Sequence, residues 1–327
     1  MFPITEEEVK KALPKEDANT DPLGMDAFDS VSHKSVRWAC MRLGIPDPLI
    51  NYFQQVLGAA TTAIGRNAPV SINSGVLQGD PLSSLLFNFV LDGVLEEALD
   101  RQGPQQDRYE LDGTPASALL YADDAVLLSR SEAGLQAFLD AFNEAAGKVG
   151  LKLNPSKCRY FAAGRGSRSA RSCLKLADTT LSPMSPEDTQ KYLGLLYSPE
   201  GVRMGNITAA LRKGVANIYA TNISLQHKYW CLRDFLLPRF VYELSLGRVG
   251  TRDIETADHL VREFMRSLGR LPRCTPVEFF HAPTSMGGLG LMQFRSKIVC
   301  AKNGAAKAAA NSSDPLVKAA VKCDPLS

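Results

Sequence analysis

The chain has 327 residues, of which 45% are hydrophobic and 22% are charged. This is the composition of an ordinary globular protein, and the length allows two or three compact units with hydrophobic cores. The formal net charge is only +2. Bulk charge therefore does not indicate a nucleic-acid partner, and local basic surfaces would have to bind one.

Three features predict an intracellular protein that is not secreted and does not cross a membrane. The chain has no run of about 18 apolar residues, which a membrane-spanning helix would need. Residues 1–8 have neither the basic nor the apolar region of a signal peptide. The seven cysteines are scattered, odd in number and without a Cys-x-x-Cys pair, which argues against a disulfide framework and against a zinc site.

Apolar spacing and turn residues predict the elements of the first half of the chain. Thr5 caps a short helix that ends near Leu13, and turn-forming residues follow to position 25. Pro81 opens a strongly apolar helix to about Leu99, since proline in the first helical turn loses no hydrogen bond. Between them lie predicted helices at 33–43 and 48–57 and predicted strands at 60–65 and 69–72.

The second half begins with two apolar strands, at residues 117–121 and 125–128, followed by an amphipathic helix at about 135–149. Residues 157–175 hold six basic and no acidic residues and are predicted to form a mobile basic loop. Further helices are predicted at about 207–222, 227–246 with a kink at Pro238, and 251–268. From Ala301 the composition predicts a weak helix that frays.

Two adjacent carboxylates, Asp123 and Asp124, stand between the two apolar strands. Aspartate is a common turn residue, so a tight hairpin turn could account for both. Alternatively, the turn presents them at the edge of a sheet to hold cations, because like charges this close resist joint ionisation unless a cation neutralises them. Two-metal phosphoryl-transfer sites use this arrangement, with ions roughly 3.5–4 Å apart, and Mg²⁺ suits sites made only of oxygen ligands.

The surrounding motifs favour the metal-binding interpretation. The segment 121–124, Tyr-Ala-Asp-Asp, resembles the catalytic hairpin of reverse transcriptases. Upstream, the segment 75–83, Gly-Val-Leu-Gln-Gly-Asp-Pro-Leu-Ser, resembles the turn and helix with which that family contacts template and nucleotide. Downstream, the segments 150–158 and 190–194 resemble the family's segment after the palm helix and its primer grip. Four motifs in the family's order predict a reverse transcriptase.

Further segments resemble one subclass, the site-specific non-LTR retrotransposons that insert into ribosomal DNA. They are residues 28–33 (Phe-Asp-Ser-Val-Ser-His), 232–239 (Leu-Arg-Asp-Phe-Leu-Leu-Pro-Arg) and 276–283 (Pro-Val-Glu-Phe-Phe-His-Ala-Pro). The last two lie outside the general polymerase motifs and therefore bear on the subclass. The resemblance covers about residues 26–300.

The resemblance implies an α+β fold. A right-hand polymerase palm, with helices on an antiparallel sheet, would occupy residues 26–200 and a mostly helical thumb residues 201–300. Residues 1–25 would be a remnant of largely missing fingers, and residues 301–327 a weakly ordered tail. The implied function is RNA-directed DNA polymerisation in target-primed reverse transcription. Its partners would be an RNA template, a DNA primer and deoxynucleoside triphosphates, in the nucleus and cytoplasm.

The resemblance also implies roles for particular residues. Asp123 and Asp124 would be catalytic and hold two Mg²⁺ ions, and Phe28 would be the gate that rejects a 2′-hydroxyl on the incoming nucleotide. Lys157 is a candidate proton donor to pyrophosphate, with an ordinary surface lysine as the alternative. The residues implied to contact nucleotide or template are Phe28, Gln78, Gly79, Tyr121 and Lys157, and those of the primer grip are Tyr192, Leu193 and Gly194.

The sequence departs from the family near its start. The family's first catalytic aspartate should stand five residues before Phe28, where this chain has Leu23, while Asp26 is three residues too late and Asp21 two too early. A three-residue displacement along a strand moves a carboxylate by about 10 Å and to the other face. The basic fingers that hold the triphosphate are also absent. We therefore predict impaired polymerisation, because ion positioning and charge stabilisation supply most of this catalysis.

The sequence is compatible with two other functions. The absent aspartate and fingers favour a non-catalytic remnant that binds nucleic acid, or a relic without function. The basic loop at 157–175 and the thumb arginines could bind RNA phosphates in a salt-sensitive manner, or the loop could simply be solvated. RNA-dependent RNA polymerisation is disfavoured, because Phe28 stands where a bulky gate excludes ribose.

Overall fold

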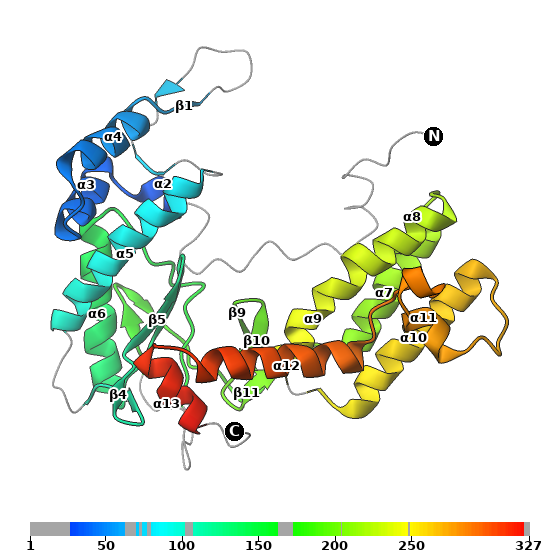
Figure 1. Cartoon of the computed structure of the whole chain (residues 1–327). Helices are drawn as coiled ribbons and strands as arrows, with labels where there is room; N and C mark the ends of the chain where they lie inside the picture. The colour runs from blue at the N-terminus through cyan, green and yellow to red at the C-terminus, as the bar shows by residue number, and fades with distance from the viewer. Residues whose placement is uncertain are drawn as a thin grey trace. The chain divides into compact units, whose positions relative to one another are not determined.

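The computed structural model describes residues 27–62, 70–71, 74–76, 80–101, 107–162, 173–203, 205–247 and 249–323. These residues form two compact units (Figure 1). The first unit contains the described residues up to 185 together with 314–323, and the second unit contains the described residues of 186–313. The chain therefore leaves the first unit after residue 185 and returns to it after residue 313.

Helices form the framework of the first unit. They are α2 (Ala27–Ser30), α3 (His33–Arg42), α4 (Asp47–Gly58), α5 (Pro81–Arg101), α6 (Glu132–Lys148) and α13 (Pro315–Cys323). Helices α3 and α6 are capped at their N-termini by Ser32 and Ser131, whose side chains accept a hydrogen bond from the backbone N–H three residues later. Helix α5 packs against α3 and α6, and the core that they share includes Phe87, Phe138 and Phe142.

The strands described in the first unit form separate antiparallel pairs rather than one broad sheet. The pairs are β1 (Thr61–Thr62) with β2 (Val70–Ser71), β3 (Glu110–Leu111) with β4 (Thr114–Pro115), β5 (Ala118–Tyr121) with β6 (Asp124–Leu127), and β7 (Lys175–Leu176) with β8 (Thr179–Thr180). Pairs this short depend on the helices beside them for stability. Helix α6 contacts both β6 and β7.

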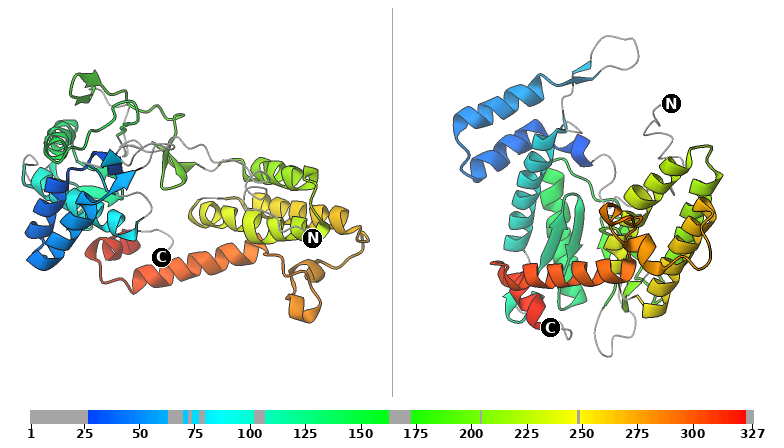
Figure 2. Two further views of the ribbon diagram at one scale, coloured as in Figure 1. Left: turned by 90° about the horizontal axis from the view of Figure 1, so that it is seen from above. Right: turned by 45° about the vertical axis from the view of Figure 1, so that its right-hand side comes forward.

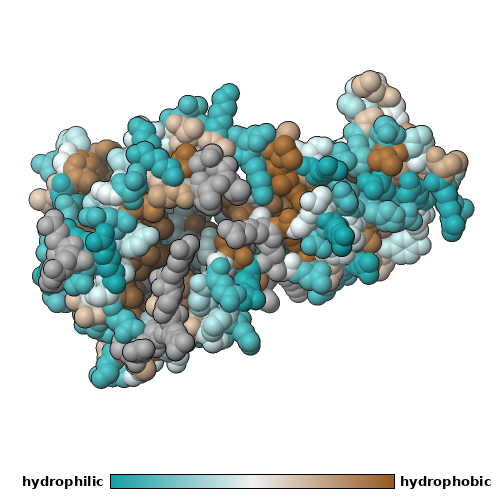
Figure 3. All heavy atoms as spheres, turned by 90° about the horizontal axis from the view of Figure 1, so that it is seen from below, coloured by the Kyte–Doolittle hydropathy of each residue, from teal (hydrophilic) through white to brown (hydrophobic). Residues whose placement is uncertain are grey.

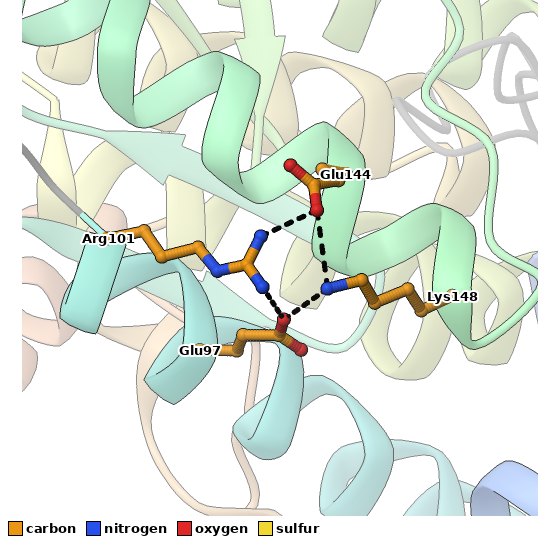
Figure 4. Close-up of polar contacts among 4 residues, drawn as sticks. All are labelled: Glu97, Arg101, Glu144 and Lys148. Carbon is orange, nitrogen blue, oxygen red and sulfur yellow. Dashed lines mark hydrogen bonds and ion pairs between the residues drawn. The ribbon is translucent and has the colours of Figure 1, made fainter.

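Four charged side chains tie α5 to α6 on the surface of the first unit (Figure 4). Arg101 lies 2.8 Å from the carboxylate of Glu97 and 2.6 Å from that of Glu144. Lys148 lies 2.6 Å and 3.3 Å from the same two carboxylates. Each cation therefore contacts one carboxylate from each helix. An isolated exposed ion pair contributes little to stability, but a closed group of four is the arrangement in which such pairs contribute most.

The second unit is mainly helical. Its elements are β9 (Gln190–Tyr192), β10 (Leu195–Ser198), β11 (Gly201–Arg203), α7 (Ile207–Ala220), α8 (Leu225–Trp230), the π-helix η2 (Cys231–Leu236), α9 (Leu237–Leu246), α10 (Thr251–Gly269), α11 (Val277–His281), the 3₁₀ turn η3 (Thr284–Met286) and α12 (Phe294–Ala310). The strands form one antiparallel sheet with β10 in the centre. These helices lie close together, as Figure 2 shows, and their buried side chains form a second core. Gly214 of α7 allows close packing there, because a Cβ atom would lie 2.5 Å from the side chain of Leu236.

The helix predicted at 227–246 with a kink at Pro238 is divided differently in the structure. Helices α8 and α9 are joined without a break by the π-helix η2. A proline ring inside a regular helix collides with the carbonyl group four residues earlier, here that of Asp234. The wider π turn immediately before Pro238 changes the position of that carbonyl, so the irregularity precedes the proline.

The α+β class is confirmed, since helices are combined with small antiparallel sheets. The predicted helices at 33–43, 48–57, 207–222 and 251–268 agree with α3, α4, α7 and α10 to within a few residues. The single antiparallel sheet expected for a palm is not seen among the described strands. The predicted helix at 5–13 and the middle of the basic loop lie outside the described residues.

The end of the chain is more regular than its alanine- and lysine-rich composition predicted. Helix α12 starts before Ala301 and runs to Ala310 because Phe294 and Ile298 are buried in the second core. Helix α13 packs against β3 and β4, where Lys322 lies 3.0 Å from the carboxylate of Asp112. Burial of an apolar face therefore supports helices that intrinsic propensity alone would leave weak.

The described surface is largely polar. On the face seen in Figure 3, hydrophobic residues occur as separate patches among hydrophilic ones, as is usual for a protein surface in water. None of the described helices combines the length and the hydropathy that a membrane span requires.

Candidate active site

The two strands β5 and β6 form a hairpin that carries the paired aspartates. Tyr121 pairs directly with Asp124, so Ala122 and Asp123 form a two-residue turn. The strands predicted at 117–121 and 125–128 are confirmed to within one residue, with Asp124 in β6 rather than between the strands. The structure therefore places both carboxylates at the end of the hairpin, one in the turn and one at the first position of β6.

The turn is strained at Ala122. Its backbone φ is +51°, in the left-handed region that a residue with a Cβ atom rarely adopts. Holding a non-glycine residue there costs about 1–3 kcal/mol, and such conformations cluster at functional sites. An alanine cannot offset this cost with a side-chain hydrogen bond as asparagine or aspartate can. The conformation is therefore maintained by the strand pairing on either side of it.

The two faces of the hairpin differ. Ala118, Ala125 and Leu127 pack against the core of the first unit. Tyr121 points to the opposite face and is 65% exposed. Residues directly opposite each other in an antiparallel pair share a face, so the side chain of Asp124 leaves the hairpin on the same side as Tyr121. The hairpin thus has one face packed on the core and one more exposed face, on which the Oδ1 atom of Asp124 is itself buried.

Phe28 lies beside the segment that leads into the Gln-Gly-Asp-Pro motif. Its carbonyl oxygen accepts a hydrogen bond of 2.8 Å from the N–H of Val76. Gly75 has φ +87° and lies so close that a Cβ atom would be 2.6 Å from Cα of Asp29. Glycine is thus required at position 75. The structure brings together Phe28 and residues 74–76.

The ring of Phe28 stacks on that of Phe87, with 4.3 Å between centroids and 18° between ring planes. Phe87 belongs to α5 and is fully buried. The structure therefore fixes the candidate gate residue through a partner that the sequence alone did not identify. The spacing within α5 could have suggested a core residue at position 87, but not which ring it would meet. Gln78 and Gly79 lie outside the described residues.

Lys157 lies in a turn after the buried residue Leu151. Its backbone N–H donates a hydrogen bond of 3.1 Å to the carbonyl of Asn154. The Asn154 side chain also accepts hydrogen bonds from the backbone N–H and the hydroxyl of Ser156, which fixes the turn locally.

The candidate primer grip forms the turn between β9 and β10 in the second unit. Leu193 and Gly194 have φ of +47° and +79°, and two consecutive positive φ angles are typical of a type I′ hairpin turn. The hydroxyl of Tyr242 on α9 donates a hydrogen bond of 2.9 Å to the carbonyl of Leu193. Tyr192 packs edge-on against Tyr197 of β10, with 6.0 Å between ring centroids. Burial raises the pKa of the Tyr197 hydroxyl above its usual value.

The donor atoms at the hairpin fit magnesium in kind. Asp123 and Asp124 offer carboxylate oxygens, which are the ligands that Mg²⁺ prefers in proteins. A site for two ions usually needs a further carboxylate, and no group of three potential metal ligands occurs within the described ranges. Leu23, Asp21 and Asp26, where that carboxylate would be sought, lie outside those ranges.

Comparison with known proteins identifies the family. Residues 24–197, more than half of the chain, match the family described as reverse transcriptase (RNA-dependent DNA polymerase). The matched region contains the β5–β6 hairpin, Phe28 and the turn between β9 and β10.

Curated relatives extend the similarity beyond that region. The chain is 33% identical over 282 residues to the Pol polyprotein of a type-1 R2 retrotransposable element of Nasonia vitripennis, covering 83% of this chain and 27% of the relative. It is 30% identical over 280 residues to that of the type-2 element R2DM of Drosophila melanogaster, covering 82% and 26%. A type-1 R2 polyprotein of Popillia japonica is 33% identical over 288 residues, covering 84% and 46%. The chain thus spans less than half the length of these relatives. It belongs to the reverse transcriptase family and is homologous to the Pol polyproteins of R2 retrotransposable elements.

Proposed function

We propose that the chain supplies the palm and thumb of an RNA-directed DNA polymerase that serves target-primed reverse transcription of an R2-like element. In this proposal the first unit contains the palm and the helices of the second unit form the thumb. The single observation that carries the proposal is the β5–β6 hairpin, which presents Asp123 and Asp124 at a strained turn. Its substrates would be an RNA template, a DNA primer and deoxynucleoside triphosphates.

Each site residue has a distinct task in this mechanism. Asp123 and Asp124 would hold Mg²⁺, which when bound supplies charge stabilisation for attack of a 3′-hydroxyl on the α-phosphate. Tyr121, exposed on the same face as Asp124, would border the nucleotide. Phe28, held against Phe87, would lie where the sugar is bound and exclude a 2′-hydroxyl.

Other residues would position the nucleic acid. Gln78 and Gly79 would contact template or nucleotide, and Lys157 would donate a proton to the leaving pyrophosphate. The turn of Leu193 and Gly194, fixed by Tyr242, would hold the primer terminus. The protein would act in the nucleus and cytoplasm.

The proposal includes impaired catalysis. In this proposal Leu23 takes the position of the family's first catalytic aspartate, and the cationic fingers that clamp the triphosphate are largely missing. Ion positioning and charge stabilisation are nearly all that a protein contributes to phosphoryl transfer. Loss of one carboxylate should therefore lower the rate of polymerisation far more than the affinity for a primed template.

Primer extension tests this proposal. The purified chain is incubated with a primed RNA template, deoxynucleoside triphosphates and Mg²⁺, beside an intact R2 polyprotein. Asp123→Asn and Asp124→Asn serve as controls, since they remove charge with little change in shape. We expect slow extension that both substitutions abolish. Extension as fast as that of the intact relative would refute the impairment, and extension that persists in both variants would refute the assignment of the aspartates.

A second candidate, a remnant that binds nucleic acid without catalysis, is favoured by the leucine at position 23. Filter binding of the same primed template over a range of salt concentrations separates the two. Affinity that falls as salt rises indicates phosphate pairing by basic side chains. Salt-sensitive binding without extension would support the remnant, whereas weak binding without salt dependence would leave only a relic.

A further inference from the structure

Helix α3 has one buried face and one unusual exposed face. Its buried residues are Ser35, Val36, Ala39 and Cys40. The other face carries residues at positions i, i+3, i+4, i+7 and i+8, namely Lys34, Arg37, Trp38, Met41 and Arg42. Together with Gln54 of α4, these side chains line an open pocket of about 460 Å³. A half-exposed tryptophan between basic residues is unusual on a helix face that only contacts water.

Trp38 is fixed in this pocket by a glycine. Gly93 lies in the interior of α5, where glycine is less favourable than alanine by about 1 kcal/mol. A Cβ atom at this position would lie 2.5 Å from the Trp38 ring. The absence of a side chain on Gly93 thus lets one edge of the ring rest on α5, while 42% of Trp38 stays exposed. The ring is held in one place and still accessible to a ligand.

The three cations of the pocket differ in their partners. The guanidinium group of Arg42 forms ion pairs with Asp92 and Glu96 of α5, so its charge is balanced within the protein. Lys34 and Arg37 have no carboxylate partner among the described residues, and Arg37 has only a long contact of 3.4 Å to the amide oxygen of Asn51. The pocket therefore keeps positive charge beside the exposed ring.

We propose that the pocket on α3 binds single-stranded nucleic acid, with one base stacked on Trp38 and the backbone phosphates paired with Lys34 and Arg37. An aromatic ring beside cations is the arrangement by which proteins bind single strands without reading their sequence. Lys34 and Arg37 are one helical turn apart and both border Trp38, so they can contact phosphates on either side of the stacked base. None of the residues that line this pocket belongs to the β5–β6 hairpin, and the proposal does not depend on polymerase activity.

Tryptophan fluorescence gives a local test, because the chain has two tryptophans, Trp38 and Trp230. In a Trp230→Phe protein, emission reports on Trp38 alone. The probes are labelled 12-mers of uridine and of thymidine, whose total binding is followed by anisotropy and which distinguish RNA from DNA. We expect at least one of them to quench Trp38 emission as it binds. The same titration in an Asp123→Asn, Asp124→Asn background should be unchanged, even if extension is lost.

The double variant Lys34→Ala, Arg37→Ala tests the cations in the Trp230→Phe background. We expect half-saturation of the quenching to need roughly tenfold more oligonucleotide. The slope of log binding constant against log salt concentration should become shallower by about 1.4, the value for two lost phosphate contacts on a single strand. The matched control is Lys302→Ala, Lys307→Ala on the exposed part of α12, which removes the same charge. It should leave the Trp38 titration unchanged.

Three results would overturn the proposal. The first is binding by anisotropy without any change in Trp38 emission, which would place the strand elsewhere. The second is a pocket variant that titrates like the α12 control. The third is that neither oligonucleotide binds. Each of these is independent of the primer-extension result.

Discussion

The hydroxyl of Tyr242 donates a hydrogen bond of 2.9 Å to the backbone carbonyl of Leu193, 49 residues earlier in the chain. Leu193 is the first of the two residues with positive φ between β9 and β10. Helix α9 therefore holds the candidate primer grip through this hydrogen bond. The Tyr242 ring also lies close to Gly194, where an added Cβ atom would be 3.5 Å from it.

Removing this hydroxyl should weaken the turn. We expect Tyr242→Phe to lower the free energy of unfolding by about 1 kcal/mol, the usual net contribution of one hydrogen bond. Tyr219→Phe is the matched control, since Tyr219 is similarly exposed and its contact with Lys228 uses the ring face. Urea denaturation measures both variants, and equal losses would contradict a specific role of the Tyr242 hydroxyl. Any residual primer extension should fall only in Tyr242→Phe.

The stacking of Phe28 on Phe87 should be measurable as a coupling energy. A double-mutant cycle with Phe28→Leu and Phe87→Leu should give a coupling of about 0.5–1.5 kcal/mol, the range for paired aromatic rings. Phe138 of α6 is equally buried and provides the control, because a cycle of Phe28→Leu with Phe138→Leu should be additive. Similar coupling in both cycles would show general destabilisation of the core rather than contact between the two rings.

The parts of this fold that sequence predicts well are those governed by local physics. Pro81 marks the start of α5, and two apolar strands around Asp123 and Asp124 predict the hairpin, because proline and turn residues act over a few positions. The same local pattern predicts that Asp123 and Asp124 lie at a turn. The motifs on either side of them, in the family's order, predict the reverse transcriptase family.

The features of the fold that the sequence does not predict depend on contacts between residues far apart in the chain. Nothing near Tyr242 in the sequence indicates that its hydroxyl meets Leu193, and the apolar pattern of α5 does not single out Phe87 as the partner of Phe28. The π-helix before Pro238 was missed because its apolar spacing differs little from that of a kinked α-helix. Helix α13 was underestimated because its stability comes from packing on β3 and β4 rather than from its composition.

The charged group in Figure 4 predicts how the first unit responds to acid. Hydrogen bonds from Arg101 and then from Lys148 lower the pKa of Glu144 below its usual value. A lowered pKa in the folded state means that the carboxylate contributes stability above its unfolded pKa, and that this contribution is lost as the pH falls through the folded pKa. Glu144→Gln should therefore reduce stability slightly at neutral pH and not at low pH.

Salt provides the control for this prediction. The four side chains are exposed, so added salt should screen their attraction and shrink the difference between the protein and Glu144→Gln. Gln136→Ala on the same helix removes a side chain that hydrogen-bonds to Asp140 and Lys175 rather than to this group. The change in stability caused by Gln136→Ala should therefore not shrink as salt is added. A Glu144→Gln effect that is unchanged in high salt would argue against ion pairing.

Asp258 should produce the opposite dependence on pH. It is buried in α10, and its carboxylate accepts hydrogen bonds from the backbone N–H groups of Phe294, at 2.8 Å, and of Arg295, at 3.4 Å, at the start of α12. Burial raises its pKa despite these hydrogen bonds and the nearby His281. A raised pKa means that the stability linked to this group is fully present below its unfolded pKa and is lost as the pH rises through the folded pKa.

Asp258→Asn tests this directly, because the amide oxygen can still accept from Phe294 while the group no longer titrates. Urea midpoints measured from about pH 3.5 to pH 7, on either side of the ordinary aspartate pKa, should show the protein losing stability relative to Asp258→Asn as the pH rises. Asp253→Asn, at an exposed position of the same helix, controls for the loss of a charge. If the gap between the protein and Asp258→Asn stays constant across this range, the pKa of Asp258 is the same in the folded and unfolded states. The hydrogen bonds to α12 would then offset the effect of burial.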